Sequence, residues 1–241
     1  MKKCQYIVAM LLTILLMGCN AFDDTSSYTR LSHEDQSTTI KDAPINYRDP
    51  YSYLVLVNRW HGLEVDFSPR DLRQLNVLDY TGVPATTMYM RDTAAYAVEN
   101  LFQAANNEAG FTLLARSAYR SYEDQMQLYY HKLQIYGADV VDDWVAYPGH
   151  SEHQTGLALD VAAYAPGGIE RPFAYTLESQ WLAENAHRFG FIIRYPQGRE
   201  EETGVMFEPW HIRYVGVEVA TEIYRNGWIL EEFLQHHVNS N

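Results

Sequence analysis

Cysteine and positive charge are both scarce in this chain. Only Cys4 and Cys19 occur, both near the N-terminus, so the rest of the sequence can form no internal disulfide. The 18 lysines and arginines face 31 aspartates and glutamates, giving a formal net charge of −13, and no basic cluster follows Lys3. Nucleic-acid binding needs a basic surface, so we exclude that class of function. The HExxH motif of common helical zinc sites is also absent.

The first residues have the features of an export signal. Lys2 and Lys3 precede an apolar run over residues 6–17, which is too short to span a bilayer stably. Residues 16–19, Leu-Met-Gly-Cys, resemble the lipobox of bacterial lipoproteins. We therefore expect a signal peptide over residues 1–18 and a lipid-modified Cys19 that anchors the protein to the outside of the cytoplasmic membrane. The alternative is a plain secretory signal with an incidental cysteine.

Residues 19–49 are polar and show no apolar periodicity, which predicts a flexible tether. Residues 50–241 have the pattern of a single domain. Apolar residues recur at helical spacing over 94–105, 121–137, 176–190 and 217–225, and short apolar runs predict strands at 111–115, 157–163, 191–195 and 207–215. A polar tail is expected after the last helix. Because helices and strands do not alternate regularly, we expect an α+β fold.

Two distant segments carry the chemistry. The first, Pro148–Asp160, contains His153 and Asp160 seven positions apart, and the second contains Glu208 and His211 three positions apart. Two histidines and one carboxylate form a three-ligand zinc set that leaves a fourth position for water. The remaining carboxylate is of the type that takes a proton from such a water. The sequence therefore predicts a zinc hydrolase.

Each of these residues also has a simpler interpretation. Asp160 interrupts an apolar run, and a buried carboxylate must be paired, either with an arginine or with a metal. His153 at the entry to the same strand favours the metal. A single histidine in such a strand, like His211, is more often a core residue than a metal ligand. The three-residue spacing between Glu208 and His211 does not fit one face of a regular strand, and it does not prove a helix. Spacing alone does not choose between these interpretations.

Four segments, in the same order along the chain, resemble the VanY-type D-alanyl-D-alanine carboxypeptidases and the related L,D-carboxypeptidases. The segments are Ser117–Gln125, Pro148–Val161, Trp181–Gly198 and Glu208–Gly216, and the resemblance covers most of residues 51–227. These enzymes belong with the lysostaphin and hedgehog folds in one zinc group. The resemblance implies a compact zinc-peptidase domain with a small antiparallel sheet flanked by helices.

The resemblance also implies roles for individual residues. His153, Asp160 and His211 would bind one Zn²⁺ per chain, and Glu208 would deprotonate the water bound to it. Arg120 would hold the substrate carbonyl. Contacts to the terminal residue and carboxylate of the substrate would come from three polar residues, Ser117, Gln125 and Ser151. His150 does not match a family ligand, and we expect it to stay off the metal.

The expected reaction is removal of the C-terminal D-alanine from peptidoglycan stem peptides. One alternative is L,D-carboxypeptidase activity on tetrapeptide stems, and a more distant one is a zinc-containing module that binds wall peptide without cutting it. We expect stem peptides and, through the lipid, the membrane as partners, with no nucleic acid and no obligate protein partner.

Overall fold

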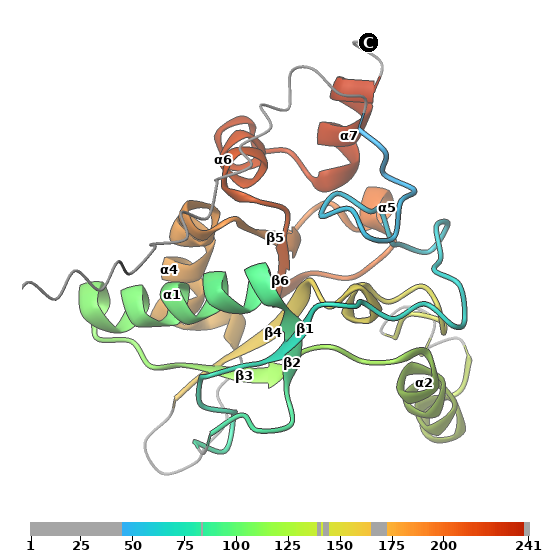
Figure 1. The fold of residues 1–241 in the computed structure, drawn as a ribbon, viewed down its shortest axis with the longest axis horizontal. Helices are drawn as coiled ribbons and strands as arrows, with labels where there is room; N and C mark the ends of the chain where they lie inside the picture. Colours follow the sequence, from blue (N-terminus) through green and yellow to red (C-terminus); the bar gives the residue numbers. More distant parts are fainter. Residues whose placement is uncertain (1–44, 83, 139–140, 142–144, 165–172, 239–241) are drawn as a thin grey trace, which may run out of the picture. The chain divides into compact units, whose positions relative to one another are not determined.

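A four-stranded antiparallel sheet lies at the centre of the fold in the computed structural model (Figure 1). Its strand order is β3 (Leu113–Ser117), β4 (Ala158–Ala163), β6 (Glu208–Tyr214) and β5 (Phe191–Tyr195). The short strands β1 (Leu72–Gln74) and β2 (Tyr89–Arg91) form a separate antiparallel pair. With the helices around these sheets, the α+β prediction and the small antiparallel sheet are confirmed.

The structure describes residues 45–82, 84–138, 141, 145–164 and 173–238. The predicted signal peptide, Cys19 and most of the predicted tether lie outside these residues. Ile45 and Tyr47, which we assigned to the tether, pack against a core cluster of the domain. None of the described helices combines the length and apolar character needed to cross a bilayer.

Helices pack on the sheet through two hydrophobic clusters. The larger cluster joins α1 (Asp92–Ala109) to β3, β4 and β6, and includes Val98, Leu101, Leu159 and Ile212. The helix predicted over 94–105 is confirmed, and Gly110, with φ +70°, caps its end in the left-handed conformation that glycine favours. The helix α4 (Leu177–Asn185) begins after Thr176, and short 3₁₀ turns, Phe173–Tyr175 and Ala186–Phe189, flank it.

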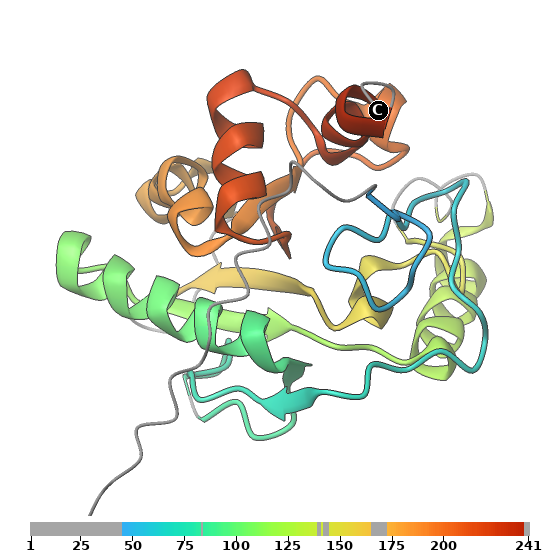
Figure 2. The ribbon, with the colours of Figure 1, turned by 45° about the horizontal axis from the view of Figure 1, so that its top comes forward.

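The smaller cluster lies under two C-terminal helices, α6 (Val217–Asn226) and α7 (Leu230–Val238), which lie together above the sheet in Figure 2. The predicted polar tail is therefore wrong for most of its length. Leu230, Phe233 and Leu234 recur at helical spacing and are buried. This short apolar stripe, set among charged residues and histidines, is easily taken for a tail when only composition is considered.

Truncation of Phe233 tests whether α7 is an integral part of the domain. Its side chain has no exposed surface. We expect Phe233→Ala to lower the free energy of unfolding by about 3–5 kcal/mol, because it leaves a cavity in the smaller cluster. Urea unfolding measures this, and Gln235→Ala on the exposed face of α7 is the control. Equal stability of the two variants would show that α7 contributes little.

The helix α2 (Tyr122–Tyr136) differs most from its predicted packing. The predicted start is confirmed, since the Ser121 hydroxyl and Asp124 carboxylate form a capping box. The predicted apolar stripe, however, is largely exposed, and only Gln125 and Tyr129 are buried. In Figures 1 and 2 this helix stands apart from the sheet, beside the segment that leads to β4. It forms one wall of the pocket described below. A further single-turn helix, α5 (Glu200–Thr203), lies between β5 and β6.

Candidate metal centre and active site

The register of the sheet brings two predicted ligands together. Asp160 of β4 and His211 of β6 are direct cross-strand partners, and Ser117 of β3 is the partner of Asp160 on its other side. Direct partners in an antiparallel pair project from the same face. Three strands therefore place Ser117, Asp160 and His211 in one row, and an Asp160 oxygen lies 3.0 Å from Nδ1 of His211.

An irregular pairing explains how Glu208 joins His211 despite the three-residue spacing. Ile212 of β6 pairs with Ile193, whereas Glu208 pairs with Tyr195, so β6 contains two more residues than β5 over this stretch. Such a bulge rotates side chains away from strict alternation. Glu208 Oε2 consequently lies 3.8 Å from His211 Nδ1.

His153 approaches from a 3₁₀ turn, Glu152–Thr155, just before β4. The Ser151 hydroxyl accepts a hydrogen bond from the His153 backbone N–H and so caps this turn. On the ring, Nδ1 lies 2.7 Å from the carbonyl oxygen of Ala118. A carbonyl can only accept, so Nδ1 carries the proton. The other nitrogen, Nε2, is then free to bind a metal and lies 3.4 Å from Asp160 Oδ1.

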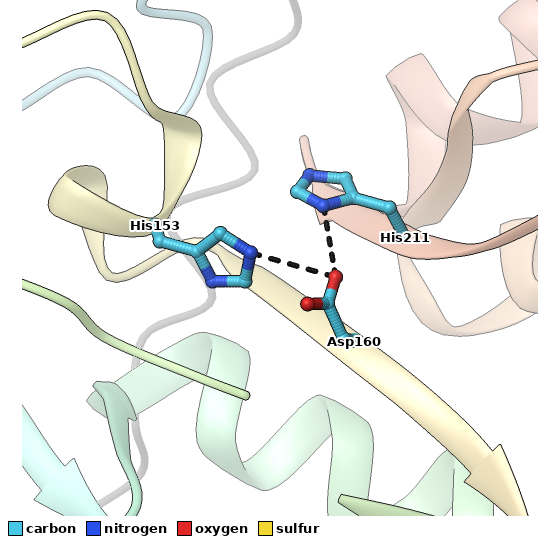
Figure 3. Close-up of side chains that lie close together, drawn as sticks. All are labelled: His153, Asp160 and His211. Atoms are coloured by element: carbon cyan, nitrogen blue, oxygen red, sulfur yellow. Dashed lines mark hydrogen bonds and ion pairs between the residues drawn. The ribbon is translucent and has the colours of Figure 1, made fainter. Parts of the chain in front are cut away.

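These three side chains fit a zinc site. His153, Asp160 and His211 each offer one ligand atom, and the three atoms lie within 4.8 Å of one another (Figure 3). Both histidines are buried. Although burial opposes ionisation, His153 and His211 hold the pKa of Asp160 well below its usual range, so it is a carboxylate. Two imidazoles and one carboxylate that converge beside an open pocket are the ligand set of a catalytic zinc.

Glu208 and His211 at this centre also have shifted pKa values. Burial raises the pKa of Glu208 to about 7, an effect that the nearby charges of His211 and Arg120 partly oppose. Glu208 can therefore both accept and release a proton near neutral pH. Burial disfavours the charged form of His211, but hydrogen bonds to Asp160 and Glu152 outweigh it and raise the pKa of His211 to about 9. The His211 ring therefore carries a proton on both nitrogens in the metal-free protein, and metal binding must displace one of the two.

A pocket of about 590 Å³ lies over the three candidate ligands. Glu208 and Arg120 also line it, as do Gln125 and Ser151, whereas Ser117 does not. Instead, Ser117 accepts a hydrogen bond from Arg120 Nη2 at 2.8 Å, and Gln125 accepts one from Arg120 Nη1 at 2.7 Å. The amide nitrogen of Gln125 is itself bound to the Ala146 carbonyl. Two of the three predicted substrate contacts thus hold the Arg120 guanidinium in place.

Several pocket residues were not singled out from the sequence. Tyr129, Tyr147 and Tyr195 contribute aromatic surface, and Arg59 and Glu152 contribute charge. Only Glu152 had a usable signal, since it immediately precedes His153 in the motif. His150 also lines the pocket, but its Nδ1 contacts the Asn58 carbonyl at 2.8 Å and it does not belong to the ligand cluster.

Comparison with known proteins agrees with this geometry. The family model for VanY, D-alanyl-D-alanine carboxypeptidase, matches residues 87–217. A D-alanyl-D-alanine carboxypeptidase of Enterococcus faecalis is 36% identical over 219 residues, covering 87% of this chain and 76% of that protein. A bifunctional D-Ala-D-Ala dipeptidase and carboxypeptidase of Enterococcus gallinarum, VanXYC, is 32% identical over 75% of this chain and 92% of its own length.

Solved structures show the same relationship. The LD-carboxypeptidase LdcB has a TM-score of 0.71 and 38% identity, over 77% of this chain and 87% of that one. VanY from a VanB-type resistance cassette, solved in complex with Zn(II), has a TM-score of 0.63 and 37% identity, over 76% of this chain and 99% of that one. Together with the buried His–Asp–His cluster, these matches show that the chain belongs to the VanY family of D-alanyl-D-alanine carboxypeptidases and is a zinc-dependent peptidase.

Proposed function

We propose that this enzyme removes the C-terminal D-alanine from peptidoglycan stem peptides that end in D-Ala-D-Ala. The observation that carries the proposal is the meeting, in one pocket, of the candidate zinc ligands with Glu208 and Arg120. A module that only binds peptide needs neither a proton acceptor nor a cation beside the metal. A related VanY structure contains D-alanine-D-alanine, which supports this class of substrate.

The residues of the pocket divide the chemistry between them. Zinc held by His153, Asp160 and His211 would supply Lewis acidity that acidifies a water and polarises the substrate carbonyl. Glu208 takes a proton as the water oxygen attacks the carbonyl carbon of the last peptide bond. When the C–N bond breaks, Glu208 gives that proton to the leaving nitrogen, so D-alanine leaves as a free amine and Glu208 is regenerated as a carboxylate. The new carboxyl group of the shortened peptide then loses its proton, which balances the proton that the amine of D-alanine takes up at neutral pH.

Arg120 acts on the carbonyl oxygen, where negative charge develops during attack. Ser117 and Gln125 fix two of its five N–H groups, which leaves the others to point at the substrate. Ser151 accepts the N–H of His153 but keeps its own hydroxyl proton. The Ser151 hydroxyl would donate a hydrogen bond to the terminal carboxylate of the peptide. Ser117 and Gln125 would act through Arg120.

Replacement of Arg120 tests its role. We expect Arg120→Lys to lower kcat by about 10²–10³-fold, because a point charge on a flexible stem cannot keep the fixed hydrogen bonds of the guanidinium. Zinc content should equal that of the wild type, since Arg120 is not a ligand. Steady-state release of D-alanine and metal analysis measure the two quantities. A wild-type kcat in this variant would remove Arg120 from the mechanism.

The stereochemistry of the penultimate residue separates the two carboxypeptidase activities. The match to the LD-carboxypeptidase LdcB fits the alternative, L,D-cleavage of tetrapeptide stems. The zinc-loaded domain should be incubated separately with pentapeptide ending in D-Ala-D-Ala and with tetrapeptide ending in one D-Ala, and product masses read. Loss of alanine from the pentapeptide supports our proposal, and loss from the tetrapeptide alone supports the alternative. No loss from either, with one zinc bound, would support a binding module.

A substrate in the cell wall requires a location outside the cytoplasm. We propose that residues 1–18 direct export and that Cys19 carries the lipid that anchors the protein to the envelope. The charged start, the apolar run and the Leu-Met-Gly-Cys sequence support this anchor. The polar segment after Cys19 would give the domain reach towards the wall.

Substitution of Cys19 distinguishes a lipid anchor from a plain secretory signal. We expect Cys19→Ser to move the processed protein from the membrane fraction to the soluble extracytoplasmic fraction, or to stop its processing, because the thiol that receives the lipid is lost. Cell fractionation and the mass of the mature N-terminus measure this. The same distribution and mass for wild type and variant would support the plain signal.

A further inference from the structure

The mechanism above does not use Glu152, a charged residue in the centre of the site. Its side chain is fully buried, and it lies in the 3₁₀ turn immediately before His153. Burial of a lone carboxylate is unfavourable unless charged or polar groups compensate it. The partners of Glu152 therefore decide what it can do.

The two oxygens of Glu152 have different partners. Oε1 accepts hydrogen bonds from Arg194 Nε at 2.8 Å and from Arg213 Nη1. Oε2 instead lies 3.4 Å from Nε2 of His211. Arg194 and Arg213 are both fully buried with it, so two guanidinium charges compensate the buried carboxylate. Glu152 is thus a fixed anion with one oxygen turned to a candidate zinc ligand.

His211 has its other nitrogen turned to the metal centre. Nδ1 lies 3.0 Å from Asp160 Oδ1 (Figure 3), whereas Nε2 is the nitrogen that faces Glu152. A neutral imidazole carries one proton, and a nitrogen that binds a metal must be free of it. A carboxylate facing Nε2 keeps the proton there, which leaves Nδ1 as the ligand atom.

We infer that Glu152 is the positioning residue of the metal centre: it accepts the Nε2 proton of His211 and fixes the ring with Nδ1 towards the metal. This inference rests on the zinc site used in the proposed function. His153 is fixed in the corresponding way by a backbone group, since its Nδ1 is bound to the Ala118 carbonyl. The two histidines thus bind the metal through different nitrogens. Acceptors of this kind orient the ring and increase its basicity.

The arginines that hold Glu152 are themselves anchored in the core. Arg213 donates to the carbonyl oxygens of Tyr53 and Val55, at 3.1 and 2.7 Å. Arg194 donates from both terminal nitrogens to Glu231 of α7, at 2.9 and 2.6 Å. Two glutamates therefore balance two arginines. Of the two glutamates, Glu152 contacts His211, whereas Glu231 contacts Arg194 and Asn58.

This difference supplies a matched control. If Glu152 serves only as a counter-ion of the arginines, loss of either glutamate charge should have the same consequence. If Glu152 orients His211, only its own loss should weaken metal binding. In Glu152→Gln, the amide oxygen should stay with the arginines, so that the NH₂ group faces Nε2 of His211. Two hydrogen-bond donors would then face each other.

The test compares Glu152→Gln and Glu231→Gln by zinc affinity, measured in competition with a chromophoric chelator, and by the melting temperature of the metal-free proteins. We expect Glu152→Gln to bind zinc about 10–100-fold more weakly than wild type. Glu231→Gln should keep wild-type zinc affinity even if its melting temperature falls. If Glu152→Gln binds zinc as tightly as wild type, or if both variants lose zinc affinity equally, the role of Glu152 is overturned but the metal site is not. A wild-type protein without zinc affinity would overturn the proposed metal site as well.

A measurement on the wild type keeps the test open if Glu152→Gln does not fold. Long-range ¹H–¹⁵N correlation spectra of the zinc-loaded protein report which nitrogen of each histidine ring carries the proton. We expect one ligand ring protonated at Nδ1, His153, and the other at Nε2, His211. Two metal-bound rings that are both protonated at Nδ1 would contradict the role assigned to Glu152.

Discussion

Glu208→Gln should abolish peptide hydrolysis while leaving zinc bound. The variant keeps the shape of the side chain but cannot accept a proton from water or return one to the leaving amine. Loss of a general acid–base group lowers the rate by about 10²–10⁴-fold. The expected result is therefore a kcat for D-alanine release reduced by on the order of 10³-fold. Zinc content should stay at one per chain, because the three ligands are other residues.

The exposed Glu218 of α6 provides the control for this experiment. Glu218→Gln removes the same charge away from the pocket and should leave kcat unchanged. Glu208→Ala, which also shortens the side chain, should be as inactive as Glu208→Gln. Activity in Glu208→Gln equal to that of the wild type would show that another group takes the proton, and the proposed mechanism would fail.

Asp160→Asn should lose both zinc and activity. The change removes the only carboxylate among the three candidate ligands, and a neutral amide oxygen attracts a divalent cation far less. It also removes the negative charge that both histidines face, at 3.0 Å for His211 and 3.4 Å for His153. We expect hydrolysis to fall to the background level, with no zinc retained after gel filtration.

Two controls separate the loss of metal from loss of the fold. Far-ultraviolet circular dichroism of Asp160→Asn should match that of wild-type protein from which zinc has been removed by a chelator. Zinc added back should restore hydrolysis to the stripped wild type but not to the variant. A variant that retains one zinc per chain and normal turnover would exclude Asp160 as a ligand.

The helices and strands of the domain were largely predictable because they depend on local patterns. The capping residues of α2 and the glycine that ends α1 act on neighbouring backbone groups, so short sequences specify them. The errors occurred where burial depends on distant partners. The apolar side of α2 is exposed beside the pocket, and the supposed tail folds as α7 because the rest of the domain offers a surface for Leu230 and Phe233.

The orientation of the predicted substrate-contacting side chains was harder to predict from motifs than the metal ligands. A motif identifies a polar residue near the site, but not the group to which its side chain turns. We expected Ser117 and Gln125 to contact the substrate directly, beside Arg120. In the structure both side chains accept hydrogen bonds from Arg120. Glu152 lies within the segment Pro148–Val161, yet its contact with His211 depends on a strand about 60 residues downstream, and only long-range packing creates it.

The sequence by itself determined most of the helices and strands, the three candidate metal ligands with Glu208, and the family of the chain, because residue type and order are properties of the chain. The tertiary structure decided how these residues meet. Cross-strand register places Asp160 beside His211, and the irregular β5–β6 pairing turns Glu208 to the same site. Buried arginines fix the anion behind His211. These contacts join residues far apart in sequence, so no local pattern can specify them.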